Sequence, residues 1–437
     1  MEYISELHTH SKYAAACSEQ LTLENMAASS ERKGIGLMGT ADFSHPLWFK
    51  EIKDKLEEDT KGVFRLKGSS SRTRFVLASE VSVHFSDREA PGGSASIFDR
   101  TGAVKRWHNC LLAPSIEVVE QINAELGRFG NLASDGRPQL AMRASELVEL
   151  MHGISDDIMV YPAHAWTPWF GVFGSLSGFD SMEDAYEDQA KRIYAIETGL
   201  SADPPMFWRI SKLDRYAVIS GGDAHSLPKQ GREATVLEFD RQPSYSDMIG
   251  QIKGKKFKYT IEFYPEEGKY HYDGHRKCNV SLSPEESAKY NNVCPVCGKP
   301  LTLGVMNRVN ELADREPGNV PSGAIPFVHA VPLQEVLAFV SKKTVYSSYV
   351  RDMQAKLVER FGSEFNVLLK ADAESIAGVD KELAKAIENI RAERVRIKPG
   401  YDGVFGIVDV LNGPAGGGGQ AEQGHGQKTV TEFLQKP

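Results

Sequence analysis

The segment Tyr3-Ile4-Ser5-Glu6-Leu7-His8-Thr9-His10 places two imidazoles two residues apart, just after a short apolar run. Side chains in a β-strand repeat with a period of two, so His8 and His10 are expected to point to the same face. Two neutral imidazoles that converge on one point suit Zn²⁺, Mn²⁺ or Fe. Histidine pairs also occur at this spacing without a metal, so the interpretation depends on whether further ligands follow other apolar runs.

The composition bounds the class of protein. The chain has 437 residues, of which 41% are hydrophobic and 25% charged, as is usual for a soluble globular protein of two or three domains. No apolar stretch reaches the roughly 18 residues of a membrane span, and no signal-peptide pattern opens the chain. With only five cysteines, three of them clustered, a reducing cytoplasmic location without membrane contact is expected. The net charge of −8 argues mildly against a general nucleic-acid binder, although the carboxylates of a metal site count as negative while their cations go uncounted.

Short apolar runs alternate with helix-like stretches as far as about residue 250. Examples are GIGLMGTAD (34–42), RFVLASEVSVHF (74–85), IMVYPAHAW (158–166), RIYAIETGL (192–200) and YAVISGGDAH (216–225). Each run ends in polar or metal-competent residues. This pattern predicts an α/β fold of parallel βα units, arranged as a barrel, with the functional residues at the carboxyl ends of the strands.

These run ends supply a series of candidate ligands. Any one of them alone is explained equally well as a hydrogen-bonded core or loop residue. Gathered at one rim, the carboxylates would lack a counter-charge, so the series predicts a bi- or trinuclear metal centre. Cys17 is not assigned to it, because a lone cysteine is more often a small packed residue. The predicted catalytic and metal-binding residues are His8, His10, Asp42, His45, Glu80, His108, His164, Asp223 and His225.

The order of these motifs over residues 1–240 resembles that of the PHP (polymerase and histidinol phosphatase) superfamily. The resemblance implies a distorted (βα)7 barrel with two or three divalent cations (Zn, Mn, Mg or Fe), and phosphoester hydrolysis by metal-activated water. The superfamily's second motif is commonly Thr-Asp-His, whereas Thr40-Ala-Asp42-Phe-Ser-His45 stands here, so either Asp42 or His45 is the stronger ligand candidate. The substrate is left open between a small monoester and a nucleic-acid backbone.

A second metal site is predicted farther along the chain. His275 and Cys278, followed by Cys294 and Cys297, have the spacing H-x₂-C-x₁₅-C-x₂-C of a tetrahedral structural zinc site. His271 is an alternative to His275.

The segment 253–277, which leads into this site, is rich in Lys and Arg. The candidate DNA contacts within it are Lys253, Lys255 and Lys256.

Residues 330–395 have a helical pattern. Within it, Ile376–Asp380 followed by KELAKAIENI resembles a helix-hairpin-helix unit, in which backbone N–H groups bind a phosphate. A plain helical hairpin explains the segment equally well, because Asp380 replaces the second hairpin glycine. The run Arg391, Arg394 and Arg396 is a further candidate DNA contact, although a solvated basic face is the usual explanation of such a run.

The last segment begins with the glycine-rich stretch PAGGGGQAEQGHGQ (414–427), which has the composition of a flexible linker. Gln427, Val430, Phe433 and Leu434 then resemble the box by which proteins dock on PCNA-type sliding clamps. The alternative is a frayed tail without a partner.

These parts in combination resemble the endonuclease Q family. The predicted domains are a PHP metallo-phosphoesterase barrel (1–250), a zinc-binding module (251–306), a helical DNA-binding region (307–410) and a tail with the clamp-binding box (411–437). The resemblance implies a DNA-repair endonuclease that hydrolyses the phosphodiester 5′ to uracil, hypoxanthine, xanthine or an abasic site in double-stranded DNA.

Such an enzyme turns the damaged nucleotide out of the stack, and Trp166, Trp169, Phe170 and Phe173 beside His164 are candidates for a wall against that base. Burial in the core is the other explanation of these aromatic residues. Two other functions fit parts of the chain: a PHP-type phosphatase of small phosphomonoesters, and a catalytically inactive DNA-binding scaffold tethered to a clamp.

Overall fold

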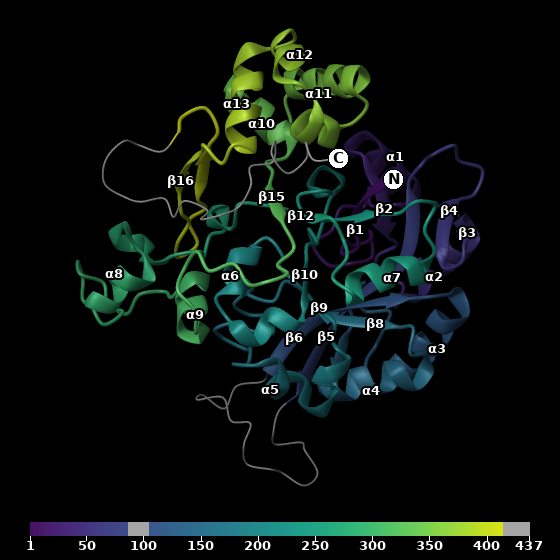
Figure 1. The fold of residues 1–437 in the computed structure, drawn as a ribbon. Helices are drawn as coiled ribbons and strands as arrows, with labels where there is room; N and C mark the ends of the chain where they lie inside the picture. The colour runs from purple at the N-terminus through teal and green to yellow at the C-terminus, as the bar shows by residue number, and fades with distance from the viewer. Residues whose placement is uncertain (86–104, 414–437) are drawn as a thin grey trace. The chain divides into compact units, whose positions relative to one another are not determined.

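The computed structural model describes residues 1–85 and 105–413 (Figure 1). The chain divides into two compact units. Unit 1 comprises Met1–Glu31, Ile35–Gly199 and Arg215–Lys258, and unit 2 comprises Arg32–Gly34, Leu200–Asp214 and Tyr259–Pro437. Unit 2 thus holds the predicted helical region and the predicted zinc module from residue 259 onward, whereas residues 251–258 of that module belong to unit 1. Residues 200–214, which the sequence pattern assigned to the first domain, belong to unit 2, where Asp214 forms an ion pair with Arg315.

Unit 1 is built on a mixed sheet whose central strands follow the order β11-β1-β2-β5-β6-β8. Strands β1, β2 and β5 run parallel to one another, whereas β11 is antiparallel to β1. The parallel strands β9 and β10 form a separate pair. The strands of unit 1 are β1 (Glu2–Glu6), β2 (Ile35–Gly39), β3 (Leu56–Thr60), β4 (Val63–Leu66), β5 (Arg74–Phe85), β6 (Lys105–Ala113), β7 (Gln139–Ala141), β8 (Met159–Pro162), β9 (Ala195–Glu197), β10 (Ala217–Ile219) and β11 (Ala234–Glu238).

The predicted α/β class with a central sheet is confirmed, but the strand directions differ from a run of parallel βα units. Strand β5 pairs antiparallel with β6, and β6 pairs antiparallel with β8. The sequence does not distinguish these cases, because β5 and β6 are buried on both faces over most of their length. The antiparallel register is important for the site, since it sets Glu80 opposite Cys110 and Ser82 opposite His108.

The helices of unit 1 present apolar stripes to this sheet. In α3, the residues Val119, Ile122 and Leu126 are buried, and the Ser115 side chain caps the helix by accepting a hydrogen bond from the Val118 N–H group. Each such buried aliphatic side chain contributes roughly 1.5–3 kcal/mol. The helices that begin in unit 1 are α1 (Leu23–Lys33), α2 (Pro46–Lys55), α3 (Ile116–Leu126), α4 (Ala144–Ile154), α5 (Met182–Tyr186), η2 (Glu187–Arg192), η4 (Leu227–Lys229) and α7 (Tyr245–Lys253).

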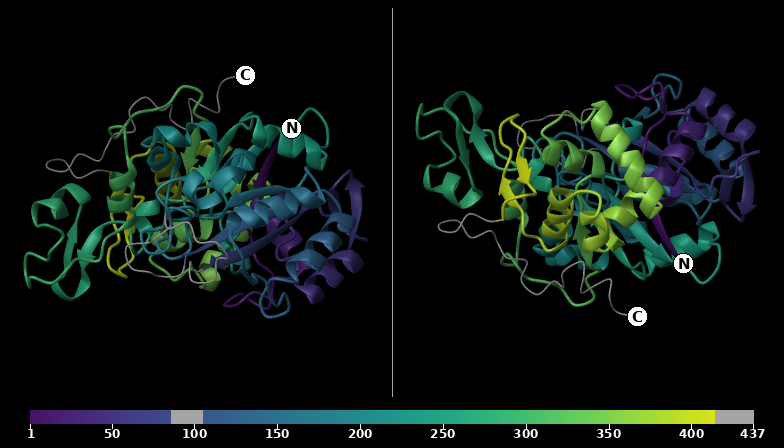
Figure 2. Two further views of the ribbon diagram at one scale, coloured as in Figure 1. Left: turned by 90° about the horizontal axis from the view of Figure 1, so that it is seen from below. Right: turned by 90° about the horizontal axis from the view of Figure 1, so that it is seen from above.

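As far as the structure describes it, to residue 413, unit 2 is mainly helical, with three short strand pairs. Strand β12 pairs parallel with β15, and the pairs β13–β14 and β16–β17 are antiparallel. The segment that carries α8 lies apart from helices α10 to α13 in each view (Figure 2). The elements of unit 2 are α6 (Pro204–Trp208), η3 (Ser211–Arg215, whose last residue belongs to unit 1), β12 (Tyr259–Glu262), η5 (Pro265–Glu267), β13 (Asp273–His275), η6 (Arg276–Cys278), β14 (Val280–Leu282), α8 (Pro284–Lys289), α9 (Val305–Leu312), β15 (Phe327–His329), α10 (Leu333–Ser341), α11 (Ser348–Phe361), η7 (Asn366–Lys370), α12 (Ala373–Ala377), α13 (Lys381–Arg391), β16 (Arg396–Lys398) and β17 (Ile407–Asp409).

Across the part of the chain that the structure describes, every helix is too short or too polar to cross a membrane.

Candidate metal centre

The segment that follows β1 carries His8 and His10 into the interior of unit 1. It is held in place by a parallel bridge between Thr9 and Ala224 and by a hydrogen bond from the His10 N–H group to the Ala224 carbonyl oxygen, 3.2 Å long. Asp223 is thereby brought beside both histidines. Nε2 of His10 lies 2.9 Å from Oδ1 of Asp223 and 3.2 Å from Oε2 of Glu80. Nε2 of His8 lies 3.6 Å and 3.5 Å from the same two oxygens.

Glu80 also takes part in a second group of ligands. Its other oxygen, Oε1, lies 2.8 Å from Nδ1 of His108 and 3.1 Å from Nε2 of His164, and these two ring nitrogens are 3.2 Å apart. One carboxylate thus contributes an oxygen to each of two adjoining groups. The first consists of His8, His10, Glu80 and Asp223, and the second of Glu80, His108 and His164.

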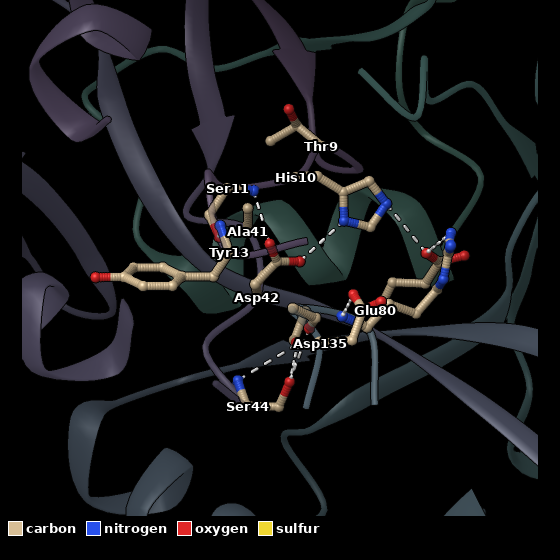
Figure 3. Close-up of polar contacts among 12 residues, drawn as sticks. Thr9, His10, Ser11, Tyr13, Ala41, Asp42, Ser44, Glu80 and Asp135 are labelled. Atoms are coloured by element: carbon tan, nitrogen blue, oxygen red, sulfur yellow. Dashed lines mark hydrogen bonds and ion pairs between the residues drawn. The ribbon is translucent and has the colours of Figure 1, made fainter. Parts of the chain in front are cut away.

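Carboxylates on the far sides of the rings fix the orientation of His8 and His10. Nδ1 of His8 lies 2.8 Å from Oε1 of Glu197, and Nδ1 of His10 lies 2.9 Å from Oδ1 of Asp42. Figure 3 shows Asp42 between the His10 ring and the Ser11 N–H group, which donates to Oδ2 at 2.6 Å. An Nδ1–H group that donates to a carboxylate leaves Nε2 unprotonated and available to a cation.

Asp42 was predicted as a direct ligand, but it orients His10 and belongs to neither ligand group. Glu197 was missed, although the run RIYAIETGL ends near it just as the other runs end in ligands. Its carboxylate also accepts a hydrogen bond from the His164 N–H group at 2.9 Å. Cys110 was missed as well. It forms a further group with His8 and Glu197. Burial raises the pKa of the Cys110 thiol to about 12.

The donor atoms of the first group fit divalent cations. Nε2 of His8, Nε2 of His10 and Oδ1 of Asp223 are buried, and none of them makes a hydrogen bond with the described residues. Leaving such a group unsatisfied costs about 1–3 kcal/mol, so three facing one another need a common partner. Imidazole and carboxylate donors suit zinc, manganese or iron. These residues therefore fit a centre of more than one cation, with Glu80 as the shared ligand.

The electrostatics of the centre agree with this assignment. Burial alone would raise the pKa of Glu80, but His108, His8 and Arg137 outweigh it and lower the pKa well below its ordinary value. Burial lowers the pKa of His108 to about 4, so this ring is neutral at physiological pH. Burial also disfavours the charged form of His10, yet Asp42, Asp223 and Glu80 raise its pKa well above the ordinary value. These ligand groups therefore attract positive charge strongly.

Arg137 is a further residue of the centre that sequence reasoning missed. Its Nη1 donates to Oε2 of Glu80 at 3.1 Å, and 24% of its side chain is exposed. Its loop approaches closely because the preceding residue is Gly136, where an added Cβ would stand 2.4 Å from Oδ2 of Asp42. No pattern in the sequence points to Arg137, since it lies in a loop before β7 rather than at the end of a long apolar run.

His45 and His225, both predicted as ligands, lie beside the centre instead. The His45 ring stacks on Tyr13, with centroids 4.5 Å apart, at the position before the first residue of α2. Nδ1 of His225 lies 2.7 Å from the carbonyl oxygen of Asp223, and its ring packs against His10. Neither residue belongs to a ligand group within the described ranges.

The predicted zinc ligands of unit 2 also come together. The candidate ligand atoms of His275, Cys278, Cys294 and Cys297 all lie within 4.8 Å of one another, and Cys297 Sγ is 3.4 Å from Nδ1 of His275. Burial alone would raise the pKa of Cys294, but the N–H groups of Cys297 and Val296 outweigh it and lower the pKa to about 6, which favours the thiolate. His271, the sequence alternative to His275, is buried outside this group.

The aromatic residues after His164 divide into core and surface. Trp166 and Phe173 are buried, with ring centroids 5.1 Å apart, so they belong to the core rather than to a wall for a base. Phe170 is partly exposed and stacks on the ligand-group residue His108, with centroids 4.8 Å apart and rings inclined by 16°. Trp169 is 43% exposed. Of these four aromatic residues, Phe170 and Trp169 are thus the two that are exposed.

Two of the predicted DNA contacts make contacts within the protein. The guanidinium group of Arg391 donates to three backbone carbonyls, those of Val367, Leu368 and Ala371, and so completes the end of η7. Nζ of Lys253 lies 4.7 Å from the centroid of the Tyr194 ring, and burial lowers the pKa of this lysine. Lys256, Arg394 and Arg396 are exposed, whereas Lys255 is half-buried.

The predicted hairpin in unit 2 forms from α12 and α13, with Gly378 between them. The Asp380 carboxylate caps α13 by accepting a hydrogen bond from the Leu383 N–H group at 3.0 Å. This carboxylate takes the place that a phosphate would need, so the geometry favours a plain helical hairpin. The predicted clamp-binding residues Gln427, Val430, Phe433 and Leu434 lie outside the described residues.

Two solved structures resemble this chain over nearly its whole length. The lesion-specific endonuclease PfuEndoQ from Pyrococcus furiosus matches with a TM-score of 0.82 and 30% sequence identity, over 94% of this chain and 95% of that one. Endonuclease Q in complex with a 27-mer duplex substrate, with an abasic lesion at its active site, matches with a TM-score of 0.80 and 30% identity, over 95% and 99% of the two chains.

The comparisons of sequence give two further matches. The family model described as the MJ0043 C-terminal domain matches residues 332–394. The uncharacterised protein MJ0043 of Methanocaldococcus jannaschii is 32% identical over 252 residues, which are 56% of this chain but 31% of that relative, so the match spans under a third of its length. The identity and coverage shared with the solved structures place this chain in the endonuclease Q family.

Proposed function

We propose that this protein is a metal-dependent DNA-repair endonuclease that hydrolyses the phosphodiester 5′ to a damaged nucleotide, either a deaminated base (uracil, hypoxanthine or xanthine) or an abasic site. The observation that carries the proposal is the shared carboxylate of Glu80, which gives one oxygen to each of two ligand groups. Adjoining cation sites are the arrangement that phosphodiester hydrolysis uses in many nucleases. The solved relatives, one of them with an abasic duplex at its active site, support DNA as the substrate.

In this proposal His8, His10, Asp223 and Glu80 would hold one cation, and Glu80, His108 and His164 would hold another. When bound, the cations would activate a water molecule and neutralise charge that develops on the phosphate. Asp42 keeps the ring of His10 in the tautomer whose Nε2 can bind a cation, and Glu197 does the same for His8.

We assign to Arg137 the orientation of the scissile phosphate. One of its N–H groups donates to Glu80, and the part of the side chain that is exposed can present the others to non-bridging phosphate oxygens. Its fixed positive charge stands next to the ligand group, where negative charge grows in the transition state.

We assign to Phe170 and Trp169 a surface for the extruded nucleotide. Phe170 lies flat against His108, and so next to the second ligand group, while part of its ring is exposed. An enzyme that acts within a duplex must unstack its target, and this costs least where pairing is already lost, as at an abasic site or a mismatched deaminated base.

The remaining assignments are also proposals. The motif order and the strand path β11-β1-β2-β5-β6-β8 support a distorted barrel of the PHP type. The group of His275, Cys278, Cys294 and Cys297 supports one structural zinc, because three thiolates and an imidazole form a closed tetrahedral site. Docking on a PCNA-type clamp rests on the sequence of the tail alone.

The experiment that tests the function uses one protein preparation on three classes of substrate. Metal-stripped protein is reconstituted with Mn²⁺, Mg²⁺ or Zn²⁺ and offered labelled duplexes with uracil, hypoxanthine, xanthine or an abasic site, an undamaged duplex, and a chromogenic phosphomonoester. Cuts on the 5′ side of lesions, and none in the undamaged duplex, are expected. Turnover of the monoester alone would select a phosphatase, and no turnover with any metal would select a binding scaffold.

A further inference from the structure

The β16–β17 hairpin of unit 2 exposes apolar side chains beside basic ones. Lys398 pairs across the hairpin with Ile407, which is 55% exposed. Phe405, two residues before Ile407, is 71% exposed. Single exposed apolar residues are common and need no explanation. Phe405 differs from such residues in the charged side chains that lie along its segment.

Three cations lie along the segment that carries Phe405. Nζ of Lys269 lies 5.9 Å from the centroid of the Phe405 ring, and Nη1 of Arg276 lies 3.4 Å from the point where a Cβ would stand on Gly403. Lys398 lies on β16, opposite Ile407 of β17. None of the three forms an ion pair with a residue in the described ranges 1–85 and 105–413. Their charge is therefore available to an anionic partner.

The segment that carries Phe405 is tightly held by neighbouring parts of unit 2. The Asp402 carboxylate accepts a hydrogen bond from the backbone N–H group of Arg276 at 2.6 Å and another from the Thr302 hydroxyl at 2.7 Å. The Tyr401 hydroxyl donates to Oδ1 of Asn279 at 2.9 Å, and the Gly406 N–H group donates to the Glu267 carbonyl oxygen at 3.0 Å. Phe405 is thus presented by a preorganised backbone, which lowers the entropy lost when a partner binds.

We propose that Lys269, Arg276, Lys398 and Phe405, together called the basic hairpin surface, form a second DNA-binding surface outside the metal centre. The three cations neutralise backbone phosphates, and Phe405 stacks against a base that has left its partner. An exposed ring among unpaired cations fits a nucleic acid, because phosphates take the charge and every base offers a flat face. The inference rests on the proposed function, since it takes DNA as the substrate.

The first test concerns the cations. Binding of an undamaged fluorescent duplex is measured over a range of salt concentrations for the wild type and for a triple alanine variant of the three cations. Each phosphate contact contributes about 0.9 to the slope of log K against log salt, so the variant should lose about 2–3 from the slope. The matched control removes the same charge at exposed ion-paired positions, with Lys50→Ala, Lys53→Ala and Arg65→Ala. Equal slopes for the two triple variants would overturn the proposal.

The second test concerns Phe405. Nicking of an abasic site is measured in a duplex and in the same strand without its complement, for Phe405→Ala, for Phe405→Trp and for the control Tyr346→Ala, whose ring is 84% exposed. Phe405→Ala should lose about tenfold on the duplex and little on the single strand, whereas Phe405→Trp and the control should match the wild type. An equal loss on both substrates, or no loss, would overturn the stacking role. A wild type that nicks no lesion would instead overturn the proposed function, and the salt slopes would still decide whether the surface binds DNA.

Discussion

The carboxylate of Asp42 lies behind the ring of His10, with Oδ1 at 2.9 Å from Nδ1, while Nε2 of the same ring faces Asp223 at 2.9 Å. Asp42 thus controls the tautomer of a ligand without being one. Asp42→Asn keeps the shape but removes the charge, so we expect cation affinity to fall about 10–100-fold. Nicking measured against metal concentration should recover at high metal. His10→Ala, which removes the ligand itself, should not recover, and an Asp42→Asn enzyme that stays inactive at saturating metal would contradict the assignment.

Glu80→Gln removes the charge that both ligand groups share. Because one carboxylate serves both groups, we expect the variant to lose more than one bound cation per molecule and at least about 10³-fold in nicking rate. Metal content measured by mass spectrometry and a gel-shift assay for DNA provide the two readouts. The matched control, Glu51→Gln, changes a carboxylate that pairs with Lys12 and Lys55 elsewhere in unit 1. Loss of DNA binding in parallel with activity would point to misfolding rather than to loss of the centre.

Much of this centre follows from sequence because its ligands are polar residues that stand in or directly after apolar runs. His8, His10, Glu80, His108, His164 and Asp223 were all predicted, and the structure brings them together. His8 and His10 follow the end of β1, His164 follows β8 and Asp223 follows β10, as the pattern predicted. Glu80 and His108 instead lie inside β5 and β6, because these strands continue past their ligands. Glu197, the last residue of β9, carries the same signal and was overlooked.

Other residues depend on contacts that the sequence does not encode locally. Arg137 reaches Glu80 only because Gly136 lets its loop pass close to Asp42. Arg391 looks like a surface cation in a basic run, yet its guanidinium group is taken up by carbonyls about twenty residues earlier in the chain. The direction of β6 is equally hidden, because a strand buried on both faces has the same composition in parallel and antiparallel pairs.

Arg137 is expected to act on the chemical step. Arg137→Ala should lower kcat about 10²-fold with a smaller effect on KM, because its charge stabilises the developing charge of the transition state. Arg137→Lys keeps a charge but loses the planar group of donors, and should recover only part of the rate. Arg143→Ala serves as the control, since Arg143 pairs with Glu187 away from the ligand groups. A change in KM alone would mean that Arg137 binds the ground state and the transition state equally.

The zinc assignment is tested by a change of one sulfur atom. Cys294→Ser should remove one equivalent of zinc and lower the melting temperature of the protein, because binding of a structural zinc contributes directly to folding. The metal centre of unit 1 uses none of these cysteines, so metal-dependent nicking of any folded fraction should survive. Cys17→Ser is the control and should retain all of the zinc. An unchanged zinc content in Cys294→Ser would exclude the site.

His329 is expected to give unit 2 a pH-dependent stability. Its Nδ1 lies 3.2 Å from Oε2 of Glu393, and its Nε2 lies 3.5 Å from Oδ2 of Asp203. Burial alone would lower the pKa of His329, but Glu393 and Asp203 raise it well above its ordinary value of 6.5. Since the folded pKa is the higher one, the stabilisation is complete below about pH 6.5 and is lost as pH rises through the folded pKa. Burial alone would raise the pKa of Glu393, but His329 lowers it below its ordinary value of 4.5, so this contribution is lost in acid instead.

His329→Gln should therefore lower the melting temperature most near pH 6, and the difference from the wild type should shrink as pH is raised. Glu393 is 46% exposed, so solvent weakens the pair, and an effect of about 1 kcal/mol is expected. This corresponds to roughly 2–4 °C for a unit of this size. Differential scanning calorimetry at several pH values measures the trend. His152→Gln is the control, because burial lowers the pKa of His152 and its substitution should not give the same slope. A difference that stays constant from pH 6 upward would mean that His329 acts by packing alone.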